Sequence, residues 1–267
     1  MVKIGLCYNW KNYEAIKVAK QAGIEYLEAG FGSFWDCSDD EFKGLVSTLN
    51  EISLPCLNYN CMLPGDRLRV VGNNVSIEAL KDYFLLLTDK LSVFDGRRVV
   101  FGSGGARAPR GEVSNNQAFL QITSYLKEVV APIFKDRGWE CVIEPLSECA
   151  VIKTIADGFR LVRETSKKQV RLLIDFYHAM ANGEDVGNLT DYKGVLTHVH
   201  VASLNGRYYP KRGDGTDYEL IFRALKDIDY QGNVSIEAKL KEGEDFNKAI
   251  TEAVICLKEA RLKVYGY

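Results

Sequence analysis

Four polar residues end, or nearly end, four apolar β-rich segments in the second half of the chain. Glu144 ends CVIE, Asp175 ends LLID, His200 lies in HVHVA, and Glu237 ends VSIE. The carboxyl ends of parallel strands meet at one edge, so these side chains would converge there. One such residue alone could equally be a strand-end charge facing solvent, but several buried carboxylates are costly without a cation. Three carboxylates and one imidazole are typical ligands of Mn²⁺, Mg²⁺, Co²⁺ or Zn²⁺.

A divalent ion beside several carboxylates suits proton transfer next to a carbonyl group. Removing that proton leaves an ene-diolate, and an ion bridging two substrate oxygens would hold its negative charge. One carboxylate could take the proton and another return it on the opposite face, which is epimerisation. Return to the adjacent carbon would instead be aldose–ketose isomerisation. The ligand set leaves both reactions open.

Two further residues are candidates for binding substrate. His178 follows Asp175 by three positions and should lie on the loop above the metal, although a capping or surface histidine is the alternative. Arg207 lies in the loop that follows the strand of His200. It could hydrogen-bond to sugar hydroxyls or to a phosphate, and a solvated loop arginine is the competing interpretation.

The first half of the chain offers weaker candidates. Arg107, in the glycine-rich GSGGAR, could meet an anion together with the backbone amides of that loop, although glycines in a tight turn would also explain the motif. Tyr8 and Glu28 stand at the ends of the first two expected strands and could line the pocket. His198 shares a strand face with His200 one layer deeper, which favours packing or support of the metal ligand.

Eight strand-then-helix units can position these residues. The expected strands are Val2–Cys7, Ile24–Ala29, Leu54–Cys61, Arg97–Gly102, Trp139–Glu144, Arg171–Asp175, Val195–Val201 and Asn233–Glu237. The expected helices are Tyr13–Ala22, Glu41–Ile52, Ile77–Leu91, Asn115–Arg137, Val151–Thr165, a short one near His178–Gly183, Tyr218–Ile228 and Phe246–Leu262. The pattern predicts an α/β fold, a single (β/α)8 TIM barrel domain over residues 1–267. A doubly wound open sheet is the alternative, but such sheets more rarely have eight units.

Composition excludes several kinds of partner. The net charge of −2 over 267 residues lacks the basic footprint that nucleic-acid binding needs. The seven cysteines are scattered and form no CxxC pair, so we expect reduced thiols in the cytoplasm and neither a disulfide framework nor a zinc knuckle. No apolar run suits a signal peptide or a membrane span, so a membrane partner is not expected.

Six segments of the chain form recognisable motifs: VIEPLS, IDFYH, HVHVASLNGR with the downstream PKRGDG, SIEAK, GSGGARAPRG and AKQAGIEYLEAGF. Together they resemble the sugar phosphate isomerase/epimerase group of xylose isomerase-like TIM barrels, particularly its ketose 3-epimerase branch. The resemblance covers almost the whole chain. It implies one divalent ion, with Mn²⁺ the first expectation, held by Glu144, Asp175, His200 and Glu237.

The resemblance also implies roles for these residues. The two residues Glu144 and Glu237 would serve as acid and base on opposite sides of the substrate, and His178 and Arg207 would bind substrate oxygens. The substrate would be a small-molecule sugar or sugar phosphate, and the protein a homodimer or homotetramer.

Two departures from the branch bear on sugar specificity. Ala150 stands where the branch has a further glutamate, with Glu148 nearby in a different register, and Gly206 is inserted before Arg207. Two other functions stay open. One is a metal-dependent dehydratase of the inosose or dehydroshikimate type, which starts with the same proton abstraction but expels water. The other is a non-catalytic sugar-binding barrel. An apurinic endonuclease is discounted, because three histidines cannot supply its cluster of several metals.

Overall fold

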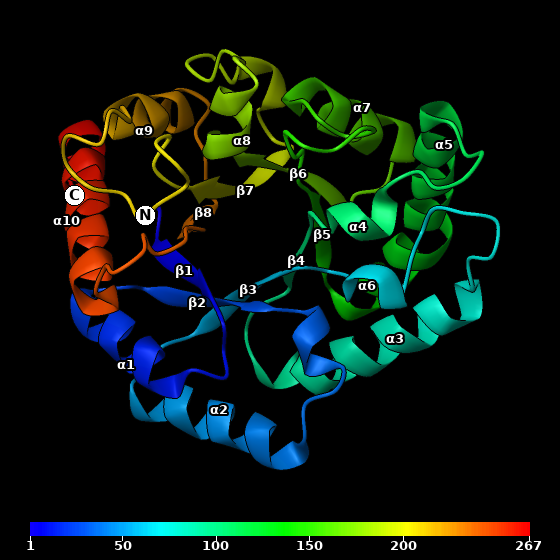
Figure 1. Ribbon diagram of the computed structural model, residues 1–267, viewed down its shortest axis with the longest axis horizontal. Coiled ribbons are helices and arrows are strands. Elements are labelled where there is room, and N and C mark those ends of the chain that lie inside the picture. The colour runs from blue at the N-terminus through cyan, green and yellow to red at the C-terminus, as the bar shows by residue number, and fades with distance from the viewer.

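Eight parallel strands close into a barrel, with each strand paired to its neighbour and the last paired to the first (Figure 1). The strands are β1 (Ile4–Tyr8), β2 (Tyr26–Gly30), β3 (Cys56–Asn60), β4 (Arg98–Phe101), β5 (Glu140–Ile143), β6 (Val170–Asp175), β7 (Leu196–Val201) and β8 (Asn233–Ile236). The computed structural model describes the backbone of residues 1–267 and every side chain except that of Asp66. The predicted (β/α)8 TIM barrel is confirmed.

The helices form a ring outside the barrel (Figure 1). They are α1 (Tyr13–Ala22), α2 (Asp39–Glu51), α3 (Ile77–Lys90), α4 (Gly104–Arg107), α5 (Asn115–Tyr125), α6 (Ala131–Arg137), α7 (Ile155–Thr165), α8 (Phe176–Ala181), α9 (Tyr218–Asp227) and α10 (Phe246–Tyr265). Ser38 starts α2 by accepting from the Glu41 amide in a capping box. Gly23 ends α1 with a φ of 102°, which glycine adopts without strain. In the described part of the chain, no helix is long and apolar enough for a membrane crossing.

Two segments differ from the sequence-based expectation. The long helix expected over Asn115–Arg137 is divided by a π-helical turn at Leu126–Val130. Pro132 follows within the first two positions of α6, where a proline has no N–H to donate to the preceding turn, so the wider turn accommodates it. The glycine-rich segment after β4, expected as a loop, forms the short helix α4.

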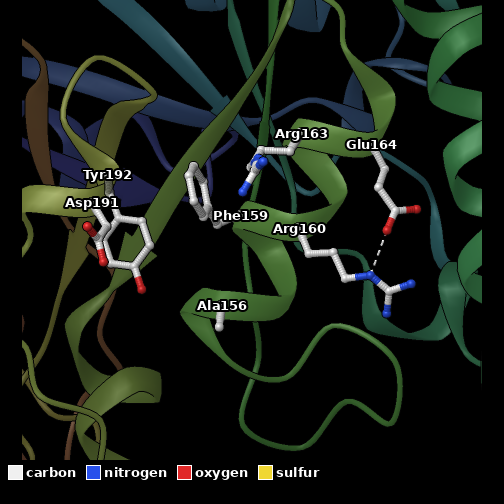
Figure 2. A pocket seen from close by; sticks show the side chains of 7 residues that line it. All are labelled: Ala156, Phe159, Arg160, Arg163, Glu164, Asp191 and Tyr192. Atoms are coloured by element: carbon white, nitrogen blue, oxygen red, sulfur yellow. Dashed lines mark hydrogen bonds and ion pairs between the residues drawn. The ribbon is translucent and has the colours of Figure 1, made fainter.

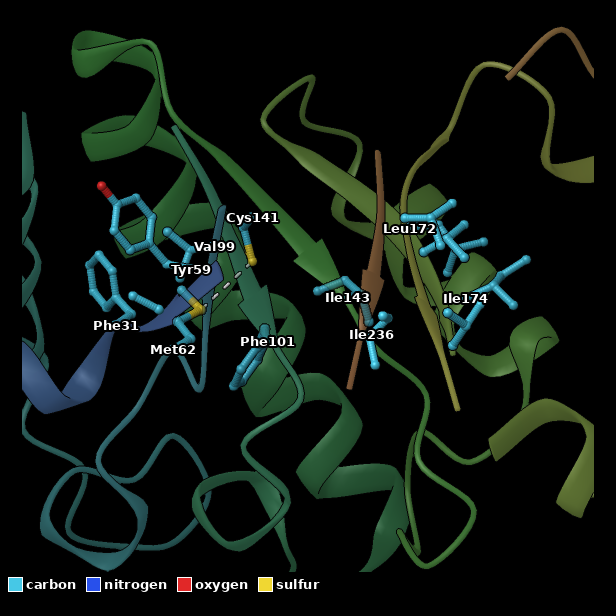
Figure 3. Close-up of a cluster of buried hydrophobic side chains, with 14 of the residues drawn as sticks. Phe31, Tyr59, Met62, Val99, Phe101, Cys141, Ile143, Leu172, Ile174 and Ile236 are labelled. Atoms are coloured by element: carbon cyan, nitrogen blue, oxygen red, sulfur yellow. Dashed lines mark hydrogen bonds between the residues drawn. The ribbon is translucent and has the colours of Figure 1, made fainter. Parts of the chain in front are cut away.

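Apolar side chains between the barrel and the helices form the main core, part of which Figure 3 shows around β4, β5 and β6. Inside the barrel the apolar residues Val100, Val142 and Leu173 form a separate small cluster. Other buried residues at inward positions are polar and hydrogen-bonded to each other, as buried polar groups must be. These residues are Tyr26, Glu28, Asn58, His198 and Ser235. The polar interior lies directly beneath the carboxyl ends of the strands.

Candidate metal centre

The structure brings together the four residues expected to bind a metal. Glu144 directly follows β5, Asp175 ends β6, His200 lies near the end of β7, and Glu237 directly follows β8. One ligand atom from each lies within 4.8 Å of those from the others. The Nδ1 atom of His200 is 3.0 Å from Oε1 of Glu144 and 3.1 Å from Oε2 of Glu237. Four potential ligands from four strands therefore face one point at the barrel mouth.

Glu28 fixes the imidazole of His200 from below. Its Oε1 atom is 2.9 Å from Nε2 of His200, and its Oε2 atom is 2.6 Å from Nε2 of His198. Ser235 donates a further hydrogen bond to Oε2 over 2.5 Å. Burial would raise the pKa of Glu28, but the two imidazoles lower it by more. An ionised Glu28 accepts a hydrogen bond from the Nε2–H group of His200, which directs Nδ1 toward the barrel mouth as the atom that can bind a metal ion.

The carboxylates at the mouth repel one another. Burial, followed by the nearby Glu237, raises the pKa of Glu144 and also that of Asp175, the latter to about 6. Burial would raise the pKa of Glu237 too, but His200 and Arg207 lower it to about 2. A bound cation would relieve this repulsion, and three hard oxygen donors with one nitrogen fit a divalent ion.

A second group of potential ligands lies deeper in the barrel. Among the described residues, Glu28, His198 and His200 also bring ligand atoms within 4.8 Å of one another. Those atoms are already hydrogen-bonded to each other within a fully buried cluster. The group at the mouth is therefore the better metal site, and the deeper group supports it.

Gly102 and Arg107 shape the backbone around Glu144. A Cβ atom at Gly102 would lie only 2.0 Å from Oε2 of Glu144, so the carboxylate packs directly against this glycine. The buried Arg107 guanidinium donates to the carbonyl of Phe101 over 2.9 Å and to that of Glu144 over 2.6 Å. It thereby ties the end of β4 to the end of β5. These contacts give Arg107 a structural task, and its expected role in binding substrate stays a prediction.

The cationic side chain of Arg207 and the hydrogen-bonding side chain of His178 lie beside the candidate metal ligands. The Arg207 Nη2 atom is 2.5 Å from Oε2 of Glu237 and 3.2 Å from Oδ2 of Asp175. His178, expected on a loop, lies in the short helix α8, because Asp175 caps that helix directly after β6. Its side chain is buried, and its Nδ1 atom accepts from the Ser147 amide over 3.4 Å. In the described part of the chain its buried Nε2 atom has no hydrogen-bond partner. Because burial, and then Arg207, lower the pKa of His178, the ring is neutral and Nε2 carries the proton.

Of the other residues at the barrel mouth, Tyr8 was expected from the sequence and Asn60 was not. Tyr8 is half-buried and its ring lies 5.0 Å from that of Phe246 at the rim. Asn60, at the end of β3, donates to Oε1 of Glu237 over 2.6 Å and was not singled out from the sequence. The position of Asn60 in the sequence could have identified it, because it ends a strand and shares a strand face with Asn58. Asn60 holds the second oxygen of Glu237 in place.

A cavity on the outer wall of the barrel lies apart from this centre (Figure 2). Its lining comes from α7 and from the short turn Thr190–Tyr192, and it includes none of the four candidate ligands. The guanidinium of Arg160 is paired there with Glu164 at 2.7 Å. This cavity is therefore separate from the candidate metal centre.

Comparisons with known proteins bear on the family and the fold of the chain. A model of the xylose isomerase-like TIM barrel family matches residues 16–260. The chain belongs to this family. A 3-dehydro-D-guloside 4-epimerase of Escherichia coli is 34% identical over 125 residues, which are 45% of this chain and 46% of that protein. A putative hydroxypyruvate isomerase of Drosophila melanogaster is 28% identical over 85% of this chain and 86% of its own length.

A crystal structure of a D-psicose 3-epimerase, determined in the presence of D-fructose, has the same fold. It superposes with a TM-score of 0.83 at 18% identity and covers 100% of both chains. The first of the two sequence relatives is matched over less than half of its length. The proteins compared are thus two named epimerases and one putative hydroxypyruvate isomerase.

Proposed function

We propose that the protein is a divalent-metal-dependent sugar epimerase or isomerase that moves a proton at a carbon next to a carbonyl. Epimerisation at C3 of a ketose is the first reaction we expect. The observation that carries the proposal is the placement of Glu144 and Glu237 within 3.1 Å of the same His200 nitrogen atom. A divalent ion held by these residues and Asp175 would supply a Lewis acid that polarises the substrate carbonyl.

The two glutamates lie in different electrostatic surroundings, and we assign Glu237 as the base and Glu144 as the acid. Glu237 has a pKa lowered to about 2, so it is ionised and able to accept a proton at neutral pH. Asn60 and Arg207 hold its two oxygens through hydrogen bonds of 2.6 and 2.5 Å. Burial raises the pKa of Glu144, which we assign as the group that returns the proton on the opposite face of the substrate. Transfer through both carboxylates would invert a stereocentre, and return through Glu237 alone would support isomerisation.

The substrate-binding roles of His178 and Arg207 follow from their free donors and charge. The Nε2–H group of His178 is 3.8 Å from Oδ2 of Asp175 and has no partner among the described residues. It can donate to a substrate hydroxyl or carbonyl oxygen. The Arg207 guanidinium, which contacts two of the carboxylates, can stabilise negative charge on the substrate.

The proposal is tested by isotope exchange. Metal-free protein is reconstituted with Mn²⁺ and incubated in D2O with ketoses, their phosphates and hydroxypyruvate, and the products are followed by NMR. We expect deuterium at a carbon next to the carbonyl, at a rate that Glu237→Gln lowers by about 10²–10⁴-fold. Glu164→Gln, which removes an exposed carboxylate on the outer wall, serves as the matched control.

Each other outcome contradicts part of the proposal. Loss of water from the sugar would identify a dehydratase. Sugar binding without exchange on any substrate would indicate a non-catalytic barrel. Exchange that persists in Glu237→Gln, or without metal, would remove the assigned base or the assigned ion.

A further inference from the structure

The guanidinium of Arg207 donates to two of the carboxylates that form the candidate metal centre. Its Nη2 atom lies 2.5 Å from Oε2 of Glu237 and 3.2 Å from Oδ2 of Asp175. The same Oε2 atom of Glu237 is 3.1 Å from Nδ1 of His200, the nitrogen atom that we assign to the metal ion. Arg207 and an ion bound at this centre would therefore share a carboxylate oxygen.

The backbone fixes Arg207 at this position. Its φ of 60° lies in the left-handed region, which residues with a side chain adopt rarely. The Arg207 amide donates to the carbonyl of Ser203 over 3.1 Å, and the Arg207 carbonyl accepts from the Lys239 amide over 3.0 Å. Lys239 lies two residues after Glu237, so these bonds tie the loop of Arg207 to the strand end that carries this carboxylate. Residues held in such rare conformations cluster at functional sites.

The ion pair between Arg207 and the carboxylates is partly enclosed by protein. The side chain of Arg207 is 27% exposed, that of Glu237 is 23% exposed and that of Asp175 is 1% exposed. The guanidinium also lies 5.5 Å from the centre of the Tyr177 ring. Solvent therefore screens this attraction less than it screens ion pairs at an open surface, and Arg207 compensates part of the negative charge at the barrel mouth.

A metal ion and Arg207 would repel each other across the shared oxygen. Divalent ions bind carboxylate oxygens at about 2.0–2.6 Å. An ion on Oε2 of Glu237 would thus lie within roughly 5 Å of Nη2 of Arg207. Even with the screening of bulk water, a double and a single positive charge at that distance repel enough to change a binding constant by about tenfold. Each cation also neutralises the negative charge that attracts the other.

We propose that Arg207 weakens metal binding at the barrel mouth, because its guanidinium and the ion share the carboxylates of Glu237 and Asp175. The inference rests on the metal centre of the proposed function, and it depends neither on the reaction nor on the substrate. It gives Arg207 a second task besides the proposed contact with substrate, which is to set how tightly the ion is held.

The test is calorimetric titration of Mn²⁺ into the full chain after dialysis has removed all metal. Arg207→Met keeps a long side chain without the charge, and we expect its Kd for Mn²⁺ to be at least about tenfold lower than that of the native protein. Arg207→Gln, which still donates hydrogen bonds, should show the same tighter binding. Arg207→Lys keeps the charge and should bind Mn²⁺ more weakly than either.

Two control variants separate the charge of Arg207 from other effects. Lys211→Met removes an exposed cation from the same loop, and so changes the net charge of the protein equally. Asn60→Leu removes the neutral donor to Oε1 of Glu237, and so frees an oxygen of the same carboxylate without a change in charge. Neither control should bind Mn²⁺ more tightly than the native protein. Urea denaturation in EDTA shows that each variant is folded, and Arg207→Gln decides if Arg207→Met is not.

The outcomes separate this inference from the proposed function. Unchanged or weaker Mn²⁺ binding in the uncharged Arg207 variants overturns the inference and leaves the metal centre standing. Tighter binding of the same size in Lys211→Met or Asn60→Leu also overturns it, since neither control removes the guanidinium. If neither the native protein nor any variant binds Mn²⁺, Mg²⁺, Co²⁺ or Zn²⁺, the metal centre of the proposed function fails, and the inference fails with it.

Discussion

Replacing Asp175 with asparagine should stabilise the metal-free protein and abolish its stabilisation by metal. The Asp175 side chain is 1% exposed, and its Oδ1 atom caps α8 by accepting from the amides of Tyr177 and His178 at 2.8 and 3.3 Å. Asparagine caps a helix as well as aspartate does. The substitution therefore keeps the cap and removes one charge from the carboxylate cluster.

The size of the effect follows from the pKa of Asp175. Burial, and then the charge of Glu237, raise this pKa from 3.8 to about 6. Between these pH values the folded state binds more protons than the unfolded state, so the stability of the metal-free protein falls as pH rises. The difference between the two pKa values corresponds to about 3 kcal/mol. Asparagine does not ionise, so Asp175→Asn should be more stable by up to about 3 kcal/mol above pH 7 and no more stable below about pH 4.

Urea denaturation in EDTA at pH 8 and pH 4, and at pH 8 with Mn²⁺, measures these free energies of unfolding. Mn²⁺ at about 100 times its Kd should add about 2.7 kcal/mol to the native protein and almost nothing to the variant. The matched control is Asp245→Asn, which changes an exposed capping aspartate of α10 and should shift stability by less than about 0.5 kcal/mol. A gain that persists at pH 4, or no gain at pH 8, would refute the electrostatic reasoning.

Two further substitutions test how the surrounding residues position the candidate metal ligands. Glu28→Gln removes the charged acceptor of the His200 Nε2–H group and should weaken Mn²⁺ binding by about 10–100-fold in a calorimetric titration. Unchanged affinity would show that Glu28 does not orient the ring. Gly102→Ala places a Cβ atom 2.0 Å from Oε2 of Glu144, and the displaced carboxylate should lower kcat/KM for isotope exchange by about 10²-fold. Native activity in this variant would show that the position of Glu144 is not critical.

The barrel and the gathering of the four candidate ligands at one edge were predictable, because both depend on local patterns. Apolar runs bounded by turns marked the strands, and strand parity placed Glu144, Asp175, His200 and Glu237 at one edge. The π-helical turn at Leu126–Val130 was not predicted. One extra residue in a single helical turn changes the spacing of apolar residues too little to be recognised in the sequence.

Contacts across the barrel could not be read from local patterns. Glu28 was expected to line the pocket, and the structure pairs it with His198 and His200, which lie about two thirds of the chain away. Such a pairing depends on how eight strands close and on their register. Gly102 gave only a turn signal, although its missing side chain is what admits the Glu144 carboxylate.

The central claim is that one divalent ion binds at the barrel mouth through Nδ1 of His200. Anomalous diffraction from a crystal soaked in Mn²⁺ tests it most directly. We predict a single peak within about 2.0–2.4 Å of Nδ1 of His200 and of oxygens from Glu144, Asp175 and Glu237. A peak on the Nε2 side of His200, between Glu28 and His198, or no peak at the mouth, would contradict the account.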